Sequence, residues 1–303
     1  MKVGISLTSA YNVKDPRDGA RWMIERAHAA RAAGLDSLFI GDHHVTAYPY
    51  YQNTPMLGRL LAEWGTSPAG CLFLLPLWNP VLVAEQVGTL ASIAEGRFIF
   101  QCGLGDDESQ FNAMGAHIKH RTSAFEESFM AVQRLLKGET VSGDRRFKFR
   151  DARITLLPAE PVEYWIGASA RPAIDRAARL GDGWIASPAI TLEEARDQLA
   201  YYLERCSAHG RKPTAIAIRR DIYVGESEQD AEEIAKRVMD KGYRGFRRPA
   251  LVIGSVDSVI KEFRSYADAG YTDVIVRHVT LDQTRALGST ARIAQVRQAL
   301  GEA

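Results

Sequence analysis

The chain has 303 residues, of which 46% are hydrophobic and 25% charged, and its formal net charge is +1. This composition is typical of a globular protein with a sizeable core, and the charge predicts no attraction to nucleic acid or to an anionic membrane surface. The cysteines, Cys71, Cys102 and Cys206, are few and widely spaced, which predicts neither a disulfide framework nor a zinc site. The start of the chain lacks the pattern of a signal peptide, and no apolar run approaches the roughly 20 residues of a membrane span. We therefore expect a cytoplasmic protein.

Short apolar strands alternate with amphipathic helices along the whole chain. We expect strands at 3–7, 37–40, 71–75, 97–102, 164–166, 183–186, 215–224 and 273–277. Helices are expected at 18–33, 54–64, 80–95, 121–137, 172–180, 191–209, 227–241, 255–269 and 289–300. Gly143 and Asp144, between apolar segments, suggest a β-hairpin insertion at about 138–158, and residues 244–252 are expected to be irregular.

Eight strands with helices between them favour a closed (β/α)8 TIM barrel, with residues 1–303 as a single domain, over an open doubly wound sheet. No GxGxxG motif follows the first strand, which further weakens the doubly wound alternative. In a barrel of this kind the active site lies at the carboxyl ends of the strands. The residues that directly follow each strand are therefore the candidate site residues.

Asp42, His43 and His44 follow the second strand. His43 is a candidate general acid or base, with Asp42 placed to orient it, and the alternative is a loop histidine satisfied by backbone groups. Neighbouring residues of an extended strand point to opposite faces, so the histidine pair predicts no shared metal ion.

Further candidates follow the third and fourth strands. Trp78 is either the wall of a site for a flat ligand or a residue packed on the next helix. Gly103 and Gly105 either let a ligand approach the backbone or form a tight turn. Asp106 is either a proton donor and acceptor or a helix cap.

The fifth strand runs into Gly167-Ala168-Ser169, directly before a helix. Backbone N–H groups at a helix start, together with a serine hydroxyl, form a natural phosphate site, to which Arg171 could add charge. The alternative is that Ser169 is only a helix N-cap. Cys102 lies inside an apolar strand and is interpreted as a core residue rather than a nucleophile.

Several stretches, in this order, resemble the bacterial luciferase-like superfamily of flavin- and deazaflavin-dependent oxidoreductases. They are AGLDSLFIGDHH (33–44), LPLWNPVLVAEQ (75–86), EGRF (95–98), WIGAS (165–169), RAARLGDGW (176–184), and IGSVD (253–257) followed by YADAG (266–270). The resemblance covers nearly the whole chain. It implies a (β/α)8 barrel with an insertion after the fourth or fifth strand, which agrees with the pattern of elements.

The resemblance also implies roles for individual residues. His43 matches the family's active-site histidine, and a non-prolyl cis peptide under the flavin ring is expected at Cys71–Leu72 or one residue later. Substrate contacts are expected from Trp78 and Tyr48. The residues expected to bind the cofactor are Cys71, Leu72, Gly103, Gly105, Gly167, Ala168 and Ser169.

The turn after the fourth strand departs from the bacterial luciferases. Those enzymes have an arginine there that contacts the flavin phosphate, and this chain has Leu104. The deazaflavin-using branch has Gly-x-Gly-Glu-like sequences there, with the carboxylate as an acid. The stretch from Gly103 to Asp106 is near that pattern, with aspartate in place of glutamate.

The leading hypothesis from the sequence is a flavin-dependent monooxygenase that uses reduced FMN, delivered by a separate reductase, and O2 to oxygenate a small organic substrate. The alternative is a deazaflavin (coenzyme F-420)-dependent dehydrogenase or reductase with His43 and Asp106 as base and acid. A third reading is a non-catalytic flavin-binding barrel. We expect a homodimer or higher homo-oligomer, with substrate specificity set by residues 48–52, Trp78 and residues 241–252.

Overall fold

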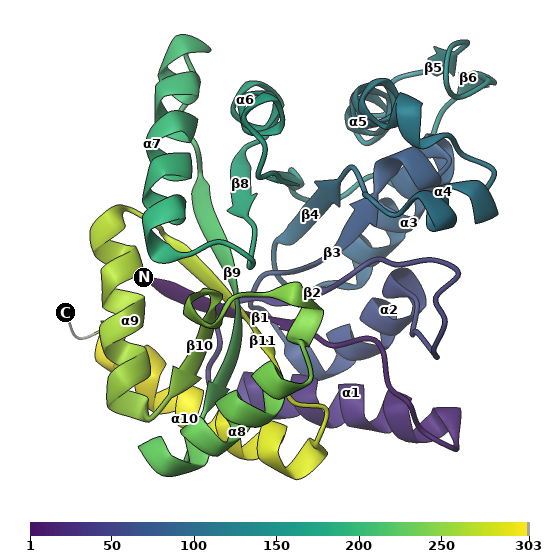
Figure 1. Ribbon diagram of the computed structural model, residues 1–303. Helices are drawn as coiled ribbons and strands as arrows, with labels where there is room; N and C mark the ends of the chain where they lie inside the picture. Colours follow the sequence, from purple (N-terminus) through teal and green to yellow (C-terminus); the bar gives the residue numbers. More distant parts are fainter. Residues whose placement is uncertain (302–303) are drawn as a thin grey trace.

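Eight parallel strands close into a barrel in the computed structural model, which describes residues 1–301 (Figure 1). They pair in the order β1-β2-β3-β4-β7-β8-β9-β11, and β11 pairs with β1. The predicted barrel is therefore confirmed, with a strand in every predicted position. Their bounds are β1 (Lys2–Leu7), β2 (Leu38–Ile40), β3 (Ala69–Leu74), β4 (Phe98–Gly103), β7 (Glu163–Gly167), β8 (Gly183–Ala186), β9 (Ala215–Val224) and β11 (Asp273–His278).

The major helices lie outside the strands and enclose the barrel (Figure 1). Local sequence signals fix where they begin: Asn79 accepts the backbone N–H of Val81 at the start of α3, and Thr191 and Glu194 form the predicted capping box of α7. No helix within residues 1–301 is long and apolar enough to cross a membrane. The helices are α1 (Pro16–Ala32), α2 (Asn53–Trp64), α3 (Pro80–Ile93), α5 (Arg121–Leu135), α6 (Arg171–Leu180), α7 (Leu192–Ala208), α8 (Glu228–Asp240), α9 (Val256–Ala269) and α10 (Gln283–Gly301).

Three features differ from the sequence prediction or add to it. The hairpin insertion consists of β5 (Val141–Gly143) and β6 (Phe149–Ala152) and projects beside α5 (Figure 1). A short helix, α4 (Glu108–Ala113), follows β4, and its polar sequence gave no apolar periodicity to predict it from. The segment expected to be irregular ends in a short strand, β10 (Leu251–Gly254), which pairs with the carboxyl half of β9.

The interior of the barrel has an apolar plug below a polar layer. Phe39, Ile99, Trp165, Ala217 and Ile275 pack together inside the strands. Side chains alternate between the two faces of a strand, so the residue two positions further along faces the interior again, nearer the carboxyl end. These next interior positions carry the polar side chains Gln101, Arg219 and Arg277 and the glycines Gly41 and Gly167.

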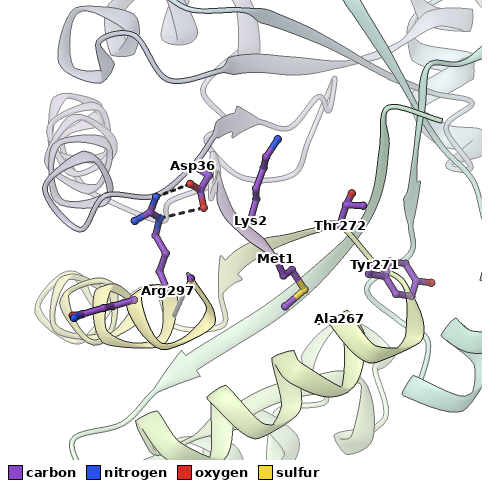
Figure 2. Close-up of a pocket in the computed structure, with 9 residues that line it drawn as sticks. Met1, Lys2, Asp36, Ala267, Tyr271, Thr272 and Arg297 are labelled. Atoms are coloured by element: carbon purple, nitrogen blue, oxygen red, sulfur yellow. Dashed lines mark hydrogen bonds and ion pairs between the residues drawn. The ribbon is translucent and has the colours of Figure 1, made fainter. Parts of the chain in front are cut away.

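A cavity of about 660 Å³ lies at the opposite, amino end of the strands (Figure 2). Its lining includes Lys2, the first residue of β1, Thr272, which precedes β11, and Asp36, which precedes β2. Asp36 accepts hydrogen bonds from the backbone N–H of Val3 and from Arg297 on α10, at 2.8 Å each. These bonds tie the last helix to the barrel, and this end of a (β/α)8 barrel serves stability rather than catalysis.

Candidate active site at the carboxyl end of the barrel

Glycines on the interior face leave the backbone accessible at the carboxyl end. A Cβ built on Gly103 would lie 3.7 Å from its nearest neighbour, and one on Gly167 would lie 3.6 Å from its nearest neighbour. Both distances are ordinary contacts, so packing within the protein does not require glycine at either position. The missing side chains instead leave room for a flat ligand to approach the ends of β4 and β7.

His43 lies at this end of the barrel, held by Gln110 of α4. Nδ1 of His43 lies 3.4 Å from the side-chain nitrogen of Gln110, whose Oε1 accepts the backbone N–H of His44 at 3.3 Å. Because the amide oxygen faces a donor, the amide NH2 group faces Nδ1. The neutral imidazole then carries its proton on Nε2, an assignment that follows from the hydrogen-bond network.

The surroundings of His43 favour its neutral form. Its pKa is lowered from the ordinary value, first by burial and then by the positive charges of Arg277 and Arg244, while Asp42 and Asp106 act in the opposite direction. The His43 side chain is nevertheless exposed to solvent. A neutral imidazole beside open solvent is suited to hydrogen bonding with a substrate oxygen.

Asp42 has other partners than the one predicted for it. Its Oδ2 accepts the backbone N–H of Leu74 at 2.7 Å and the indole N–H of Trp78 at 2.8 Å. Its Oδ1 lies 3.1 Å from Nε2 of His44, at ion-pair distance but without the angles of a hydrogen bond. Asp42 therefore braces the end of β3, and the hydrogen bond to His43 comes from Gln110 instead.

The two residues predicted to contact substrate lie in different surroundings. Trp78 is half-buried, with its ring edge-on to Phe73 and His44, so its position is fixed by packing as well as by Asp42. Tyr48 is 62% exposed on its loop. Tyr50, two residues on, meets the His43 ring at 5.7 Å in a perpendicular arrangement. Residues 48–52 were expected to set substrate specificity, and within them Tyr50, not Tyr48, lies beside His43.

The turn after β7 has the features of an anion site. Ser169 is exposed, and within residues 1–301 its hydroxyl makes no hydrogen bond. The N-cap of α6 is Ala170, which supplies no capping side chain, so the interpretation of Ser169 as an N-cap is wrong. The helix start and the hydroxyl therefore remain available to a phosphate. Arg171 instead forms an ion pair with Asp197 of α7 at 3.6 Å, so its charge is directed away from the turn.

The expected cis peptide in β3 is absent, since the chain has no cis peptide bond within residues 1–301. This expectation is wrong because β3 remains extended and in register with β4 up to Leu74. The Leu72 carbonyl accepts a hydrogen bond from Asn53 at 2.7 Å, and the carboxylate of Asp42 accepts the backbone N–H of Leu74. These backbone groups are therefore hydrogen-bonded in the extended strand. Cys71 is fully buried in the core against the helices, whereas Leu72 is partly exposed. Of these two predicted cofactor contacts, only Leu72 is therefore accessible.

The turn after β4 carries the other proposed proton-transfer group. Asp106 is exposed and lies within electrostatic reach of His43. Its neighbour Asp107 caps α4, and hydrogen bonds within that cap lower the pKa of its carboxyl group. Gly105 has a φ of +72°, a conformation that favours glycine, and Leu104 is half-buried against the core.

A cluster of charged side chains that the sequence interpretation missed lies inside the barrel across from these glycines. Asp221 accepts hydrogen bonds from Nε of Arg219 at 3.0 Å and from the Tyr243 hydroxyl at 2.7 Å. Burial lowers the pKa of Arg219 to about 10, and the charges of Arg277 and Arg244 add to this effect. The signal was present in β9, a mainly apolar strand in which Arg219 and Asp221 share one face and Arg220 lies between them on the other.

The donor set fits a flavin-type ring. Within residues 1–301 no group of three or more His, Cys, Asp or Glu side chains is arranged to hold a metal. The interior face of β4 presents Gln101, 8% exposed, whose buried Nε2 has no hydrogen-bond partner among the described residues. A carbonyl oxygen of a bound ring would satisfy this donor. Leu72 and Leu74 of β3 belong to an apolar cluster beside it, suited to the ring's face.

Comparison with known proteins agrees with this geometry. A model of the luciferase-like monooxygenase family matches residues 1–250. An F420-dependent glucose-6-phosphate dehydrogenase from Intrasporangium calvum is 25% identical over 89% of this chain and 92% of its own length. An F420-dependent hydroxymycolic acid dehydrogenase from Mycobacterium tuberculosis is 26% identical over 69% of this chain and 61% of its own length.

Solved structures share the fold at lower identity. A monooxygenase from Streptomyces bottropensis superimposes with a TM-score of 0.83 at 19% identity, covering 99% of this chain and 100% of its own. An F420-dependent secondary alcohol dehydrogenase superimposes with a TM-score of 0.81 at 17% identity, covering 99% and 98%. Likeness at these identities establishes the barrel architecture alone.

Proposed function

The chain belongs to the luciferase-like monooxygenase family, whose matched relatives are oxidoreductases, and we propose that it transfers hydride between a small-molecule substrate and a deazaflavin, coenzyme F-420. The observation that carries this proposal is that relatives aligned over most of the chain are F420-dependent dehydrogenases. The stretch from Gly103 to Asp106 supports it, because it places a carboxylate where the deazaflavin branch has one.

The leading hypothesis from the sequence, a monooxygenase using FMN and O2, has weaker support. The similar monooxygenase structure from Streptomyces bottropensis is 19% identical, a likeness that speaks for the fold and not for the cofactor. Leu104 also stands where an arginine would contact the FMN phosphate. The separate flavin reductase belongs to that hypothesis and has no part in the deazaflavin proposal.

The chain's own residues suit the deazaflavin, which when bound supplies a hydride donor or acceptor. Gly103 and Gly167 would admit the ring, and the amide of Gln101 would hydrogen-bond a ring oxygen. The Ser169 hydroxyl and the start of α6 would hold the phosphate. We expect Ser169→Ala to weaken coenzyme binding about ten-fold without changing stability, because the hydroxyl has no partner in the protein.

Proton handling falls to two side chains with separate tasks. Neutral His43 presents an Nε2–H group and would hold the substrate oxygen by a hydrogen bond, as the Gln110 contact dictates. Asp106, which is exposed, would exchange the proton that a carbonyl oxygen gains on reduction and a hydroxyl loses on oxidation. The base role predicted for His43 thus becomes a positioning and polarising one.

The test is a pair of binding titrations on the purified protein, one with coenzyme F-420 followed by its fluorescence and one with FMN in both redox states. We expect deazaflavin to bind at least about ten-fold more tightly than either form of FMN. Tighter FMN binding would overturn the proposal in favour of the monooxygenase. His43→Ala should retain coenzyme binding and lose turnover, whereas His28→Ala, which changes an exposed histidine of α1, should alter neither.

A further inference from the structure

Arg277, on the interior face near the end of β11, is a buried cation without an ionic partner. It is 8% exposed, and its side chain makes one hydrogen bond within residues 1–301, from a terminal nitrogen to the backbone carbonyl of Leu7 at 3.3 Å. None of the described carboxylates lies within ion-pair distance of it. Buried charges in proteins are normally paired, because an unpaired one loses its hydration without compensation.

The nearby carboxylates are committed to other groups. Asp221 lies directly across from Arg277 in the register of β9 and β11, but Arg219 and Tyr243 occupy its two oxygens. Asp42 accepts two hydrogen bonds at Oδ2 and faces His44 with Oδ1. The protein itself therefore supplies no counter-charge to Arg277.

A second unsatisfied group points to the same place. The Tyr50 hydroxyl is buried and makes no hydrogen bond of proper geometry within the described chain. Burial raises the pKa of Tyr50 to about 12, and the nearby Ser9 opposes this only in part. A Cβ built on Gly41 would lie 3.2 Å from this hydroxyl and 3.6 Å from a terminal nitrogen of Arg277. The two donors therefore converge on Gly41, where a side chain would crowd the Tyr50 hydroxyl.

We propose that Arg277 and the Tyr50 hydroxyl bind an anionic group of the substrate, a carboxylate or a phosphate, beside His43. A guanidinium group and a hydroxyl together match the oxygens of such an anion. The Tyr50 ring already packs against His43, so an anion bound there would place the rest of the substrate next to the imidazole. The inference rests on the proposed function for the redox chemistry of that substrate, but not for the binding itself.

The position of this pair separates it from the phosphate of the coenzyme. The turn at residues 167–169 follows β7, and β8 and β9 lie between β7 and β11 in the barrel. The coenzyme phosphate has its donors at that turn, with the uncapped start of α6. Arg277 and Tyr50 are therefore assigned to a different anion from the one held after β7.

The test uses inorganic phosphate as the probe and the unfolding temperature of the full chain as the readout, at constant ionic strength. Phosphate should raise the unfolding temperature of the wild type and of Arg59→Gln, which removes an exposed surface charge from α2. In a Ser169→Ala background, which weakens the phosphate site after β7, Arg277→Gln should bind phosphate at least about ten-fold more weakly and Tyr50→Phe about three-fold more weakly. Equal phosphate affinity in that background with and without Arg277→Gln, or no binding by the wild type, would overturn the proposal.

Deazaflavin titration of the same variants identifies which anion the site serves. Arg277→Gln should bind the coenzyme within about two-fold of wild type, because its phosphate is held elsewhere. A loss of about ten-fold or more in coenzyme affinity would assign Arg277 to the coenzyme and refute a substrate site. If the wild type binds no deazaflavin but still shows Arg277-dependent phosphate binding, the proposed function fails while the anion site stands.

Discussion

The buried carboxylate of Asp42 gives a direct test of how the loop carrying His43 is held. Asp42 is 1% exposed, and its Oδ2 accepts hydrogen bonds from the backbone N–H of Leu74 and the indole N–H of Trp78. Asp42→Ala would leave both donors without an acceptor, and each buried unsatisfied donor costs about 1–3 kcal/mol. We therefore expect Asp42→Ala to lower the free energy of unfolding by about 2–6 kcal/mol.

Asp42→Asn is the matched variant, because it removes the charge and keeps one oxygen. Hydrogen bonds to a charged group contribute about 1.5–3 kcal/mol and neutral ones about 0.5–1.5 kcal/mol. With two such bonds, the loss for Asp42→Asn should be about 2–3 kcal/mol at most, and smaller than for Asp42→Ala. The order of the two variants follows from hydrogen-bond satisfaction alone.

Guanidinium denaturation followed by tryptophan fluorescence measures both losses, and deazaflavin-linked turnover is measured in native buffer. A loss below about 1 kcal/mol for Asp42→Ala would refute the reasoning that the carboxylate braces β3 and Trp78. Stable Asp42 variants that lose turnover as completely as His43→Ala would show instead that Asp42 acts on His43, as the sequence suggested.

Three further predictions concern the site and the fold. Gly103→Ala should fold normally and weaken deazaflavin binding about ten-fold. Gly70→Ala should prevent folding, because its new Cβ would lie 1.8 Å from a backbone oxygen of β4, and circular dichroism distinguishes the two variants. Gln110→Leu should raise KM for the substrate and broaden the pH profile, because His43 would no longer be held in one tautomer; an unchanged profile would exclude this role for Gln110. Burial lowers the pKa of His278 to about 3. Between pH 6.5 and 3 the histidine is therefore protonated in the unfolded chain but neutral in the folded one, so the free energy of unfolding should fall with pH over this range, by up to about 5 kcal/mol. As the pH is lowered from about 6.5 to 3, the denaturation midpoint of the wild type should approach that of His278→Gln. A difference between the two midpoints that does not change with pH would contradict the lowered pKa of His278.

The barrel could be predicted from the sequence because its strands are covered on both faces. Stretches such as 71–75 and 97–102 are continuous apolar runs, and Pro80 and Gly96 bound the helix between them. The short helix α4 could not be predicted in the same way, because only Gln110 and Phe111 of its residues are buried. Its position depends on contacts with the loop after β2, which no local pattern contains.

The candidate site could be predicted only where a residue directly follows a strand. His43 and the turn at residues 167–169 were identified from that position, and the structure places both at the carboxyl end. Gln110 and Tyr50 lie on a helix and a loop that reach the site through tertiary packing. Arg277 lies within a strand, and the sequence alone does not show that its side chain is on the interior face of the barrel.

The apolar plug gives the charges above it their effect on His43. Phe39, Ile99 and Trp165 fill the barrel below the polar layer with buried apolar side chains. Charges in such surroundings interact more strongly than they do in water, which is why Arg277 lowers the pKa of His43. An anion bound to Arg277 would offset part of the positive charge that acts on His43, and the pKa of His43 would rise toward its ordinary value. Substrate binding and the protonation of His43 are therefore coupled, and by linkage a more acidic solution should tighten the binding of an anionic substrate.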